Sequence, residues 1–277
     1  MGRVSLGWRY AKQSLAIVRR DGALTALAAI GFALGLVLAT GPLVLAAWAF
    51  DAENDVAGWI AVAAAFLAFY IGLTFSAVAI AAAAGEVIAG RDAKVTTSVG
   101  AAGRRLGSIL GWSVVGTLVS LGFALARGKG GRTGNALGAV GSDAWSLVTF
   151  LAVPVIAFEG LGPISTLKRS ASLYRKRWGE QMTGTVSISL TFFLLSLPAL
   201  ALLIAGIVVT AEDGPSVVGV ALAIVGLIAL TAMGLAGRAA SATFGAIVYR
   251  YATTGEVPES VARADLENLA RPASSPR

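Results

Sequence analysis

Few side chains in this chain could do chemistry, because its 277 residues include no histidine and no cysteine. Imidazole acid–base catalysis, thiolate nucleophiles and the usual zinc sites are therefore excluded. Ser187, Ser189 and Ser196 have no imidazole to activate them, and the apolar stretches around them contain no lysine that could act as a base. The sequence predicts no enzyme, no cofactor and no bound metal.

Two carboxylates are candidate functional groups, because each stands beside a glycine where an apolar stretch ends. Glu86 follows Gly85, and Glu159 precedes Gly160. An acid at the C-terminus of a helix opposes the helix dipole, at a cost of about 0.3–1 kcal/mol. One interpretation is that these acids form structural charge pairs at the cytoplasmic side. The other is that they bind cations or lipid headgroups.

Arg238 is the third candidate, as the one basic residue inside the long apolar run that closes the chain. An ionisable group within a membrane segment is a functional candidate by default. Because Arg238 is expected near the inner end of that segment, we interpret it as a residue that pairs with Glu86 or Glu159 or extends to the membrane surface.

A basic segment at 163–180 combines an apolar stripe with a cluster of cations. The stripe recurs at steps of three and four residues and consists of Ile164, Leu167, Ala171, Tyr174 and Trp178. The candidate contacts for anionic lipid or a partner are Lys168, Arg169, Arg175, Lys176, Arg177 and Trp178. This pattern is typical of a helix that lies in the membrane surface. The alternative is that the cluster only sets the orientation of the chain.

Six apolar stretches would position these groups, since each is close to the ~20 residues that cross ~30 Å of hydrocarbon. They cover 23–49, 57–84, 106–126, 143–158, 184–210 and 216–237. The fourth is the weakest and could begin near Asn135, and the sixth could continue to Tyr251. A surface helix is also expected at 3–20, because the apolar run that follows it is too long for a signal peptide.

The predicted fold class is all-α, a polytopic membrane protein with six transmembrane helices and amphipathic surface helices on its cytoplasmic side. A content of 56% hydrophobic and 13% charged residues is outside the range of soluble proteins. The membrane domain covers 1–252, and 253–277 form a polar tail. The net charge of +7 does not indicate nucleic acid, because the charges lie between apolar stretches.

The basic residues are distributed unequally among the loops. If the N-terminus is cytoplasmic, 19 of the 22 lysines and arginines lie inside and 3 lie outside. The positive-inside rule therefore predicts that both termini are cytoplasmic. Glycines at four-residue spacing, at 31 and 35 and at 103, 107 and 111, predict close helix packing within the chain or between copies.

Two motifs resemble those of a known family. Residues 154–163 read P-x-x-x-x-E-G-x-G-P, KRS and RKRWGE follow at 168–170 and 175–180, and YRYATTGEVP stands at 249–258. Together with GWRYAKQSLAIVRRD at 7–21, they are similar to a family of bacterial six-helix membrane proteins of unknown function. The resemblance implies a bacterial cell membrane location and no established activity. A looser resemblance, on architecture alone, is to membrane domains fused to some glycerophosphodiester phosphodiesterases.

Two functions from different classes remain open. The first is a structural or regulatory membrane protein whose basic cytoplasmic surface contacts anionic lipid or a partner. The second is a transporter or carrier of a small or amphipathic molecule. Transporters usually have polar or broken helices near the bilayer midplane. Polarity there is limited here to Ser, Thr and Pro42, which favours the first.

A basic segment precedes each of the three successive pairs of apolar stretches. This pattern indicates a threefold internal repeat, and the alternative is chance similarity among the basic segments.

Overall fold

The computed structural model describes residues 22–129, 141, 145, 149–178, 185–212 and 216–255. This part of the chain is helical, with no strand, so the all-α prediction is confirmed for it. Its helices are α2 (Gly22–Asp51), α3 (Asp55–Ile88), α4 (Val95–Gly103), α5 (Leu106–Lys129), α7 (Ala152–Glu159), α8 (Pro163–Trp178), α9 (Thr185–Glu212) and α10 (Val217–Thr254). The predicted surface helix at 3–20 and most of the polar tail lie outside the described residues.

Five helices among the described residues are long and apolar enough to cross a membrane, not six as predicted. They are Gly22–Asp51, Asp55–Ile88, Leu106–Ala126, Phe192–Ala211 and Val217–Thr254. The predicted fourth span, 143–158, is represented by α7, whose eight residues extend only about 12 Å. Pro154 lacks the N–H needed inside a helix, so it lies in the first turn of α7. The earlier part of that stretch is mostly outside the described residues.

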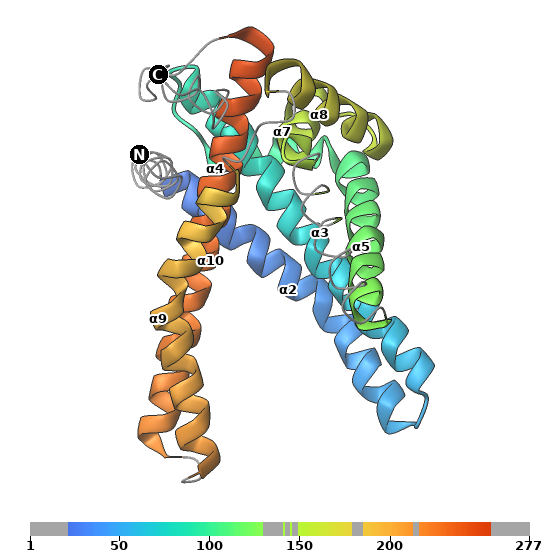
Figure 1. Cartoon of the computed structure of the whole chain (residues 1–277), viewed down its shortest axis with the longest axis vertical. Coiled ribbons are helices and arrows are strands. Elements are labelled where there is room, and N and C mark those ends of the chain that lie inside the picture. The colour runs from blue at the N-terminus through green and yellow to red at the C-terminus, as the bar shows by residue number, and fades with distance from the viewer. Residues whose placement is uncertain are drawn as a thin grey trace, which may run out of the picture.

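Four of the long helices form two antiparallel hairpins, α2–α3 and α9–α10, whose closed ends diverge (Figure 1). Small residues allow each pair to approach closely. Gly35 and Gly72 face each other between α2 and α3, where neither has room for a Cβ atom. Between α9 and α10, Gly206 packs against Ala223 and Gly226 against Leu203, again with no room for a Cβ atom. A Cβ atom on Gly103, in contrast, would meet no atom within 4 Å, so the spacing at 103–111 does not indicate a continuous contact.

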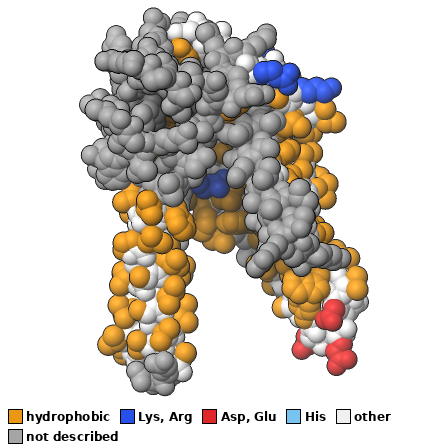
Figure 2. All heavy atoms as spheres, viewed as in Figure 1, with side chains coloured by type: hydrophobic (Ala, Val, Ile, Leu, Met, Phe, Trp, Pro, Cys, Tyr) orange, Lys and Arg blue, Asp and Glu red, His pale blue; other side chains and the backbone are white. Residues whose placement is uncertain are grey.

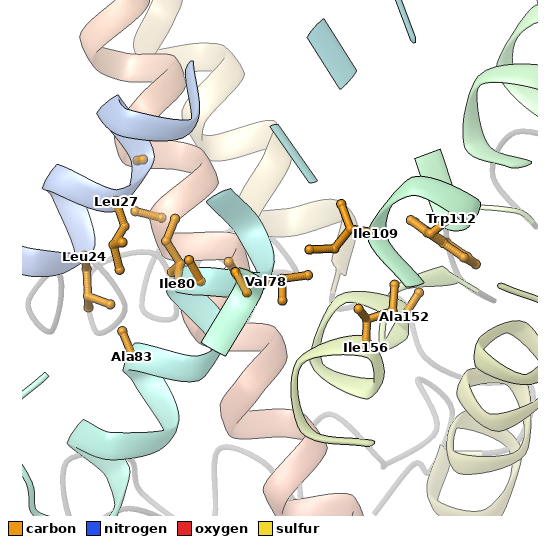
Figure 3. Packing of buried hydrophobic residues seen from close by; sticks show 14 residues of the cluster. Leu24, Leu27, Val78, Ile80, Ala83, Ile109, Trp112, Ala152 and Ile156 are labelled. Carbon is orange, nitrogen blue, oxygen red and sulfur yellow. The ribbon is translucent and has the colours of Figure 1, made fainter. Parts of the chain in front are cut away.

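The buried core lies where the two hairpins meet. It comprises the later halves of α3 and α10, with buried residues at 74–85 and 239–249, and the parts of α2, α5 and α7 that pack on them. Figure 3 shows Leu24 and Leu27 of α2, Val78 and Ile80 of α3, and Ile109 of α5 within this core. Because lipid tails are as apolar as these side chains, close packing stabilises the core more than removal from water does.

Beyond this core the hairpins carry large apolar side chains on their surfaces. Val37, Val44 and Trp48 of α2 are 67%, 68% and 70% exposed. Figure 2 shows hydrophobic side chains along both hairpins, with acidic atoms at one closed end and basic atoms at the opposite end of the molecule. The acids at the turn between α2 and α3 are Asp51, Glu53 and Asp55. Apolar surface this extensive is rare on soluble monomers and is typical of a multi-pass membrane protein.

Candidate functional site at Glu159

The carboxylate of Glu159 lies where three helices meet. Glu159 is the last residue of α7, and its side chain is 23% exposed. Arg169 of α8 donates from Nε to Oε1 at 2.8 Å and to Oε2 at 3.0 Å. The hydroxyl of Tyr249 in α10 donates to Oε1 at 2.7 Å. One carboxylate therefore links α7, α8 and α10.

The loop that follows Glu159 has the backbone conformation that orients this carboxylate. Gly160 has a φ of 67°, in the left-handed region that glycine adopts without steric cost, and it ends α7. Ser108 donates to the Gly160 carbonyl at 3.0 Å, and Arg105 donates to the Phe158 carbonyl at 3.4 Å. The Arg105 guanidinium leaves no room for a Cβ on Gly160. The beginning of α5 thus holds the loop in place.

Aromatic packing connects this cluster to α3. The ring of Phe158 stacks on that of Tyr249, with ring centroids 5.2 Å apart. Gly85 of α3 faces the Phe158 ring so closely that a Cβ would lie 2.8 Å from it. Arg250 donates to the Gly85 carbonyl at 3.4 Å. The two sequence motifs therefore meet in one place, through Phe158 and Glu159 of the first and Tyr249 of the second.

Electrostatics favours a structural role for Glu159. The hydrogen bond with Glu159 raises the pKa of Arg169 above its usual value, so the guanidinium remains charged. The charge of the carboxylate is thereby compensated, which disfavours cation binding. Among the described residues no group of three or more acids could hold a metal ion. The partner of Glu159 comes from the basic cluster at 168–177, one of the alternatives that the sequence leaves open.

The structure does not bring Glu86 into this cluster. Glu86 forms an ion pair with Arg91, just beyond the end of α3, and both side chains are exposed, at 42% and 64%. The hydrogen bond with Glu86 raises the pKa of Arg91. Exposed pairs of this kind contribute little to stability. Glu86 is therefore a local surface pair.

Arg238 does not pair with either predicted acid. Its Nη2 donates to the backbone carbonyl of Leu73 in α3 at 3.2 Å, and its side chain is exposed. Across the described part of the chain, no carboxylate forms an ion pair with it. Arg238 connects α10 to α3, and hence one hairpin to the other.

Helix α8 buries a different face from the one that its apolar stripe predicts. Thr166, Ser170 and Leu173 are buried, whereas Ile164 is 68% exposed. Burial of Thr166 is possible because its hydroxyl donates to the Leu161 carbonyl at 3.0 Å. Of the stripe, Leu167 and Tyr174 are half-buried and pack on the core.

The basic residues of α8 are divided between two environments. Arg169 turns toward Glu159, whereas Lys168 and Arg175 are exposed. Lys176, Arg177 and Trp178 form the last turn of α8, and their side chains lie outside what the structure describes.

The sequence analysis did not identify Arg105 and Ser108 as contacts of the loop that follows Glu159. It also did not identify Tyr249 as a contact of Glu159, although the position of Tyr249 in the closing motif was a signal.

The two apolar hairpins and the absence of strands among the described residues define the class, an all-helical, multi-pass membrane protein. Residues 56–258 match the Family of unknown function (DUF6159), and the chain belongs to this family. The match includes both Glu159 and Tyr249. No curated protein and no solved structure matches the chain. The finding agrees with the resemblance to a family of unknown function, and it assigns no activity.

Proposed function

We propose that this protein is a non-catalytic, structural or regulatory membrane protein that contacts anionic phospholipid through the outward face of α8. One observation supports this proposal above the others. Ile164, Lys168 and Arg175 are all exposed, and their spacing of four and seven residues places them on one side of the helix. An apolar side chain beside two cations suits the boundary between acyl chains and acidic headgroups.

Lys168 and Arg175 face outward because contacts on the other side of α8 fix the orientation of the helix. Arg169 is held by Glu159, and Thr166 by the Leu161 carbonyl, so α8 is anchored by its opposite side. Lys168 and Arg175 form no ion pair with any described acid. Near an anionic leaflet, two such cations would contribute about 2 kcal/mol together, or ~30-fold in affinity.

The proposed location is the bacterial cell membrane, with both termini and α8 on the cytoplasmic face. The unequal distribution of lysine and arginine supports this orientation. In the described structure α8 lies at the end of the molecule away from the closed ends of both hairpins (Figure 1). The acids Asp51, Glu53 and Asp55 lie at one of those closed ends, on the proposed outer side.

Lipid analysis of the purified full-length protein tests this proposal. Neutralising Lys168 and Arg175 together to Gln should reduce the phosphatidylglycerol and cardiolipin that co-purify, as measured by mass spectrometry. The matched control neutralises Lys94 and Arg104, two exposed basic residues outside α8. Equal acidic lipid in the wild type and both variants would contradict the proposal and leave α8 only its effect on topology.

A further inference from the structure

Arg238 is a cation at the junction of the two hairpins, and none of the described carboxylates forms an ion pair with it. Its hydrogen bond to the Leu73 carbonyl uses one of the five N–H donors of a guanidinium. The side chain of Arg238 is exposed. The remaining donors are available to an anion.

The position of Arg238 along α10 matches the depth of lipid phosphate. Twenty-one residues separate Val217, the first residue of α10, from Arg238, and at 1.5 Å per residue this is about 32 Å. A hydrocarbon core of ~30 Å that begins at Val217 therefore ends close to Arg238. Beyond this point the buried residues of α10 begin at Ala239, where protein contacts replace lipid. With the hydrocarbon core placed in this way, the guanidinium would lie at headgroup level.

The surroundings of Arg238 on the hydrocarbon side are apolar and open. Tyr70 of α3 lies near Arg238, and its ring is stacked with that of Phe66, one turn away. Phe66 is 51% exposed. Gly234, one turn before Arg238 on α10, has no atom within 4 Å of the place where a Cβ would be. An acyl chain can therefore approach the arginine along α10 beside Gly234.

We propose that Arg238 binds the phosphate of an anionic phospholipid whose acyl chains lie between the α2–α3 and α9–α10 hairpins. A guanidinium matches a phosphate with two parallel hydrogen bonds, and it does so best where few waters compete. The positive charge selects an acidic lipid over a zwitterionic one. This site is distinct from the outward face of α8, so the two proposals can fail separately.

Native mass spectrometry of the full-length protein in detergent, titrated with phosphatidylglycerol, tests the site. The wild type should retain one lipid that Arg238→Gln releases, with at least a tenfold rise in Kd, and Arg238→Lys should be intermediate. Gly234→Leu should weaken the same lipid while Arg238 remains, because the new side chain fills the open space. The double variant Lys168→Gln and Arg175→Gln should keep it.

Three results would overturn the inference. The first is unchanged phosphatidylglycerol affinity in both Arg238→Gln and Gly234→Leu, provided that thermal melts show both variants to be folded. The second is equal affinity of the wild type for phosphatidylcholine, since charge would then not select the lipid. The third is displacement of the lipid by millimolar inorganic phosphate, which would identify a site for the ion without its acyl chains.

Discussion

The hydroxyl of Tyr249 donates a 2.7 Å hydrogen bond to Oε1 of Glu159, a residue 90 positions earlier in the chain. The same carboxylate accepts two hydrogen bonds from Arg169. The hydrogen bond between Tyr249 and Glu159 joins the long closing helix α10 to the short helix α7. The stability of the membrane fold should therefore depend on a few polar atoms within a mostly apolar molecule.

Removal of the Tyr249 hydroxyl should destabilise the protein while leaving its aromatic packing in place. Tyr249→Phe keeps the stacking with Phe158 but loses a hydrogen bond to a charged acceptor, which contributes about 1.5–3 kcal/mol. Tyr249→Leu loses both interactions and should cost more. Thermal unfolding in detergent measures both. Equal melting temperatures for the wild type and Tyr249→Phe would show that the hydrogen bond contributes nothing.

Glu159 and Arg169 should be energetically coupled. Glu159→Gln and Arg169→Gln should each lower the free energy of unfolding by about 1–3 kcal/mol, less than for a fully buried pair, because the Arg169 side chain is 39% exposed. The double variant should cost less than the sum of the two, as a double-mutant cycle measures. Glu86→Gln is the control and should cause no measurable change, since its pair with Arg91 is exposed. Strict additivity at Glu159 and Arg169 would disprove the coupling.

The two glycines of the loop after Glu159 should differ in their tolerance of a methyl group. Gly160→Ala forces a left-handed backbone onto alanine, at about 1–2 kcal/mol, and also displaces the Arg105 guanidinium. Gly162→Ala meets no atom within 4 Å and requires no positive φ, so it should be close to neutral. The yield of folded protein in size-exclusion chromatography compares them. A Gly160→Ala variant as stable as Gly162→Ala would contradict the loop geometry.

Two buried serines should respond oppositely to loss of their hydroxyls. Ser76 donates to the Leu27 carbonyl at 2.9 Å, a bond between α2 and α3, and Ser76→Ala should cost about 0.6 kcal/mol. The hydroxyl of Ser113 has no hydrogen-bond partner among the described residues, so Ser113→Ala should be neutral or stabilising. Unfolding in denaturing detergent measures both free energies. A greater loss at Ser113 than at Ser76 would refute this assignment.

The proposed orientation predicts the side of the membrane on which each loop lies. Reporter fusions at Gly131 and Gly214 should give an external signal, and fusions at the two termini should give a cytoplasmic one, because basic segments remain inside. A cytoplasmic signal at Gly214 would be incompatible with a hairpin of α9 and α10 that opens toward the cytoplasm.

The sequence by itself determined five of the long apolar helices, but it was wrong at 143–158, where the described part contains only the short helix α7. Hydrophobicity over about 20 residues and the small residues at Gly31 and Gly35 are local features, and the structure has α2, α3 and their close contact where these features lie. The unequal distribution of lysine and arginine among the loops is also a local feature. It can be read from the sequence without knowing which helices pack together.

Tertiary structure decided which polar groups meet. The sequence could not select Arg169 from the five basic residues of α8, because that choice depends on which face of α8 packs against the core, and the buried face carries Thr166 and Ser170 rather than the apolar stripe. Nor could it show that Arg238 contacts a carbonyl of Leu73, 165 residues away, instead of an acid. Hydrophobic periodicity reports on burial along one helix, whereas these contacts depend on how separate helices cross.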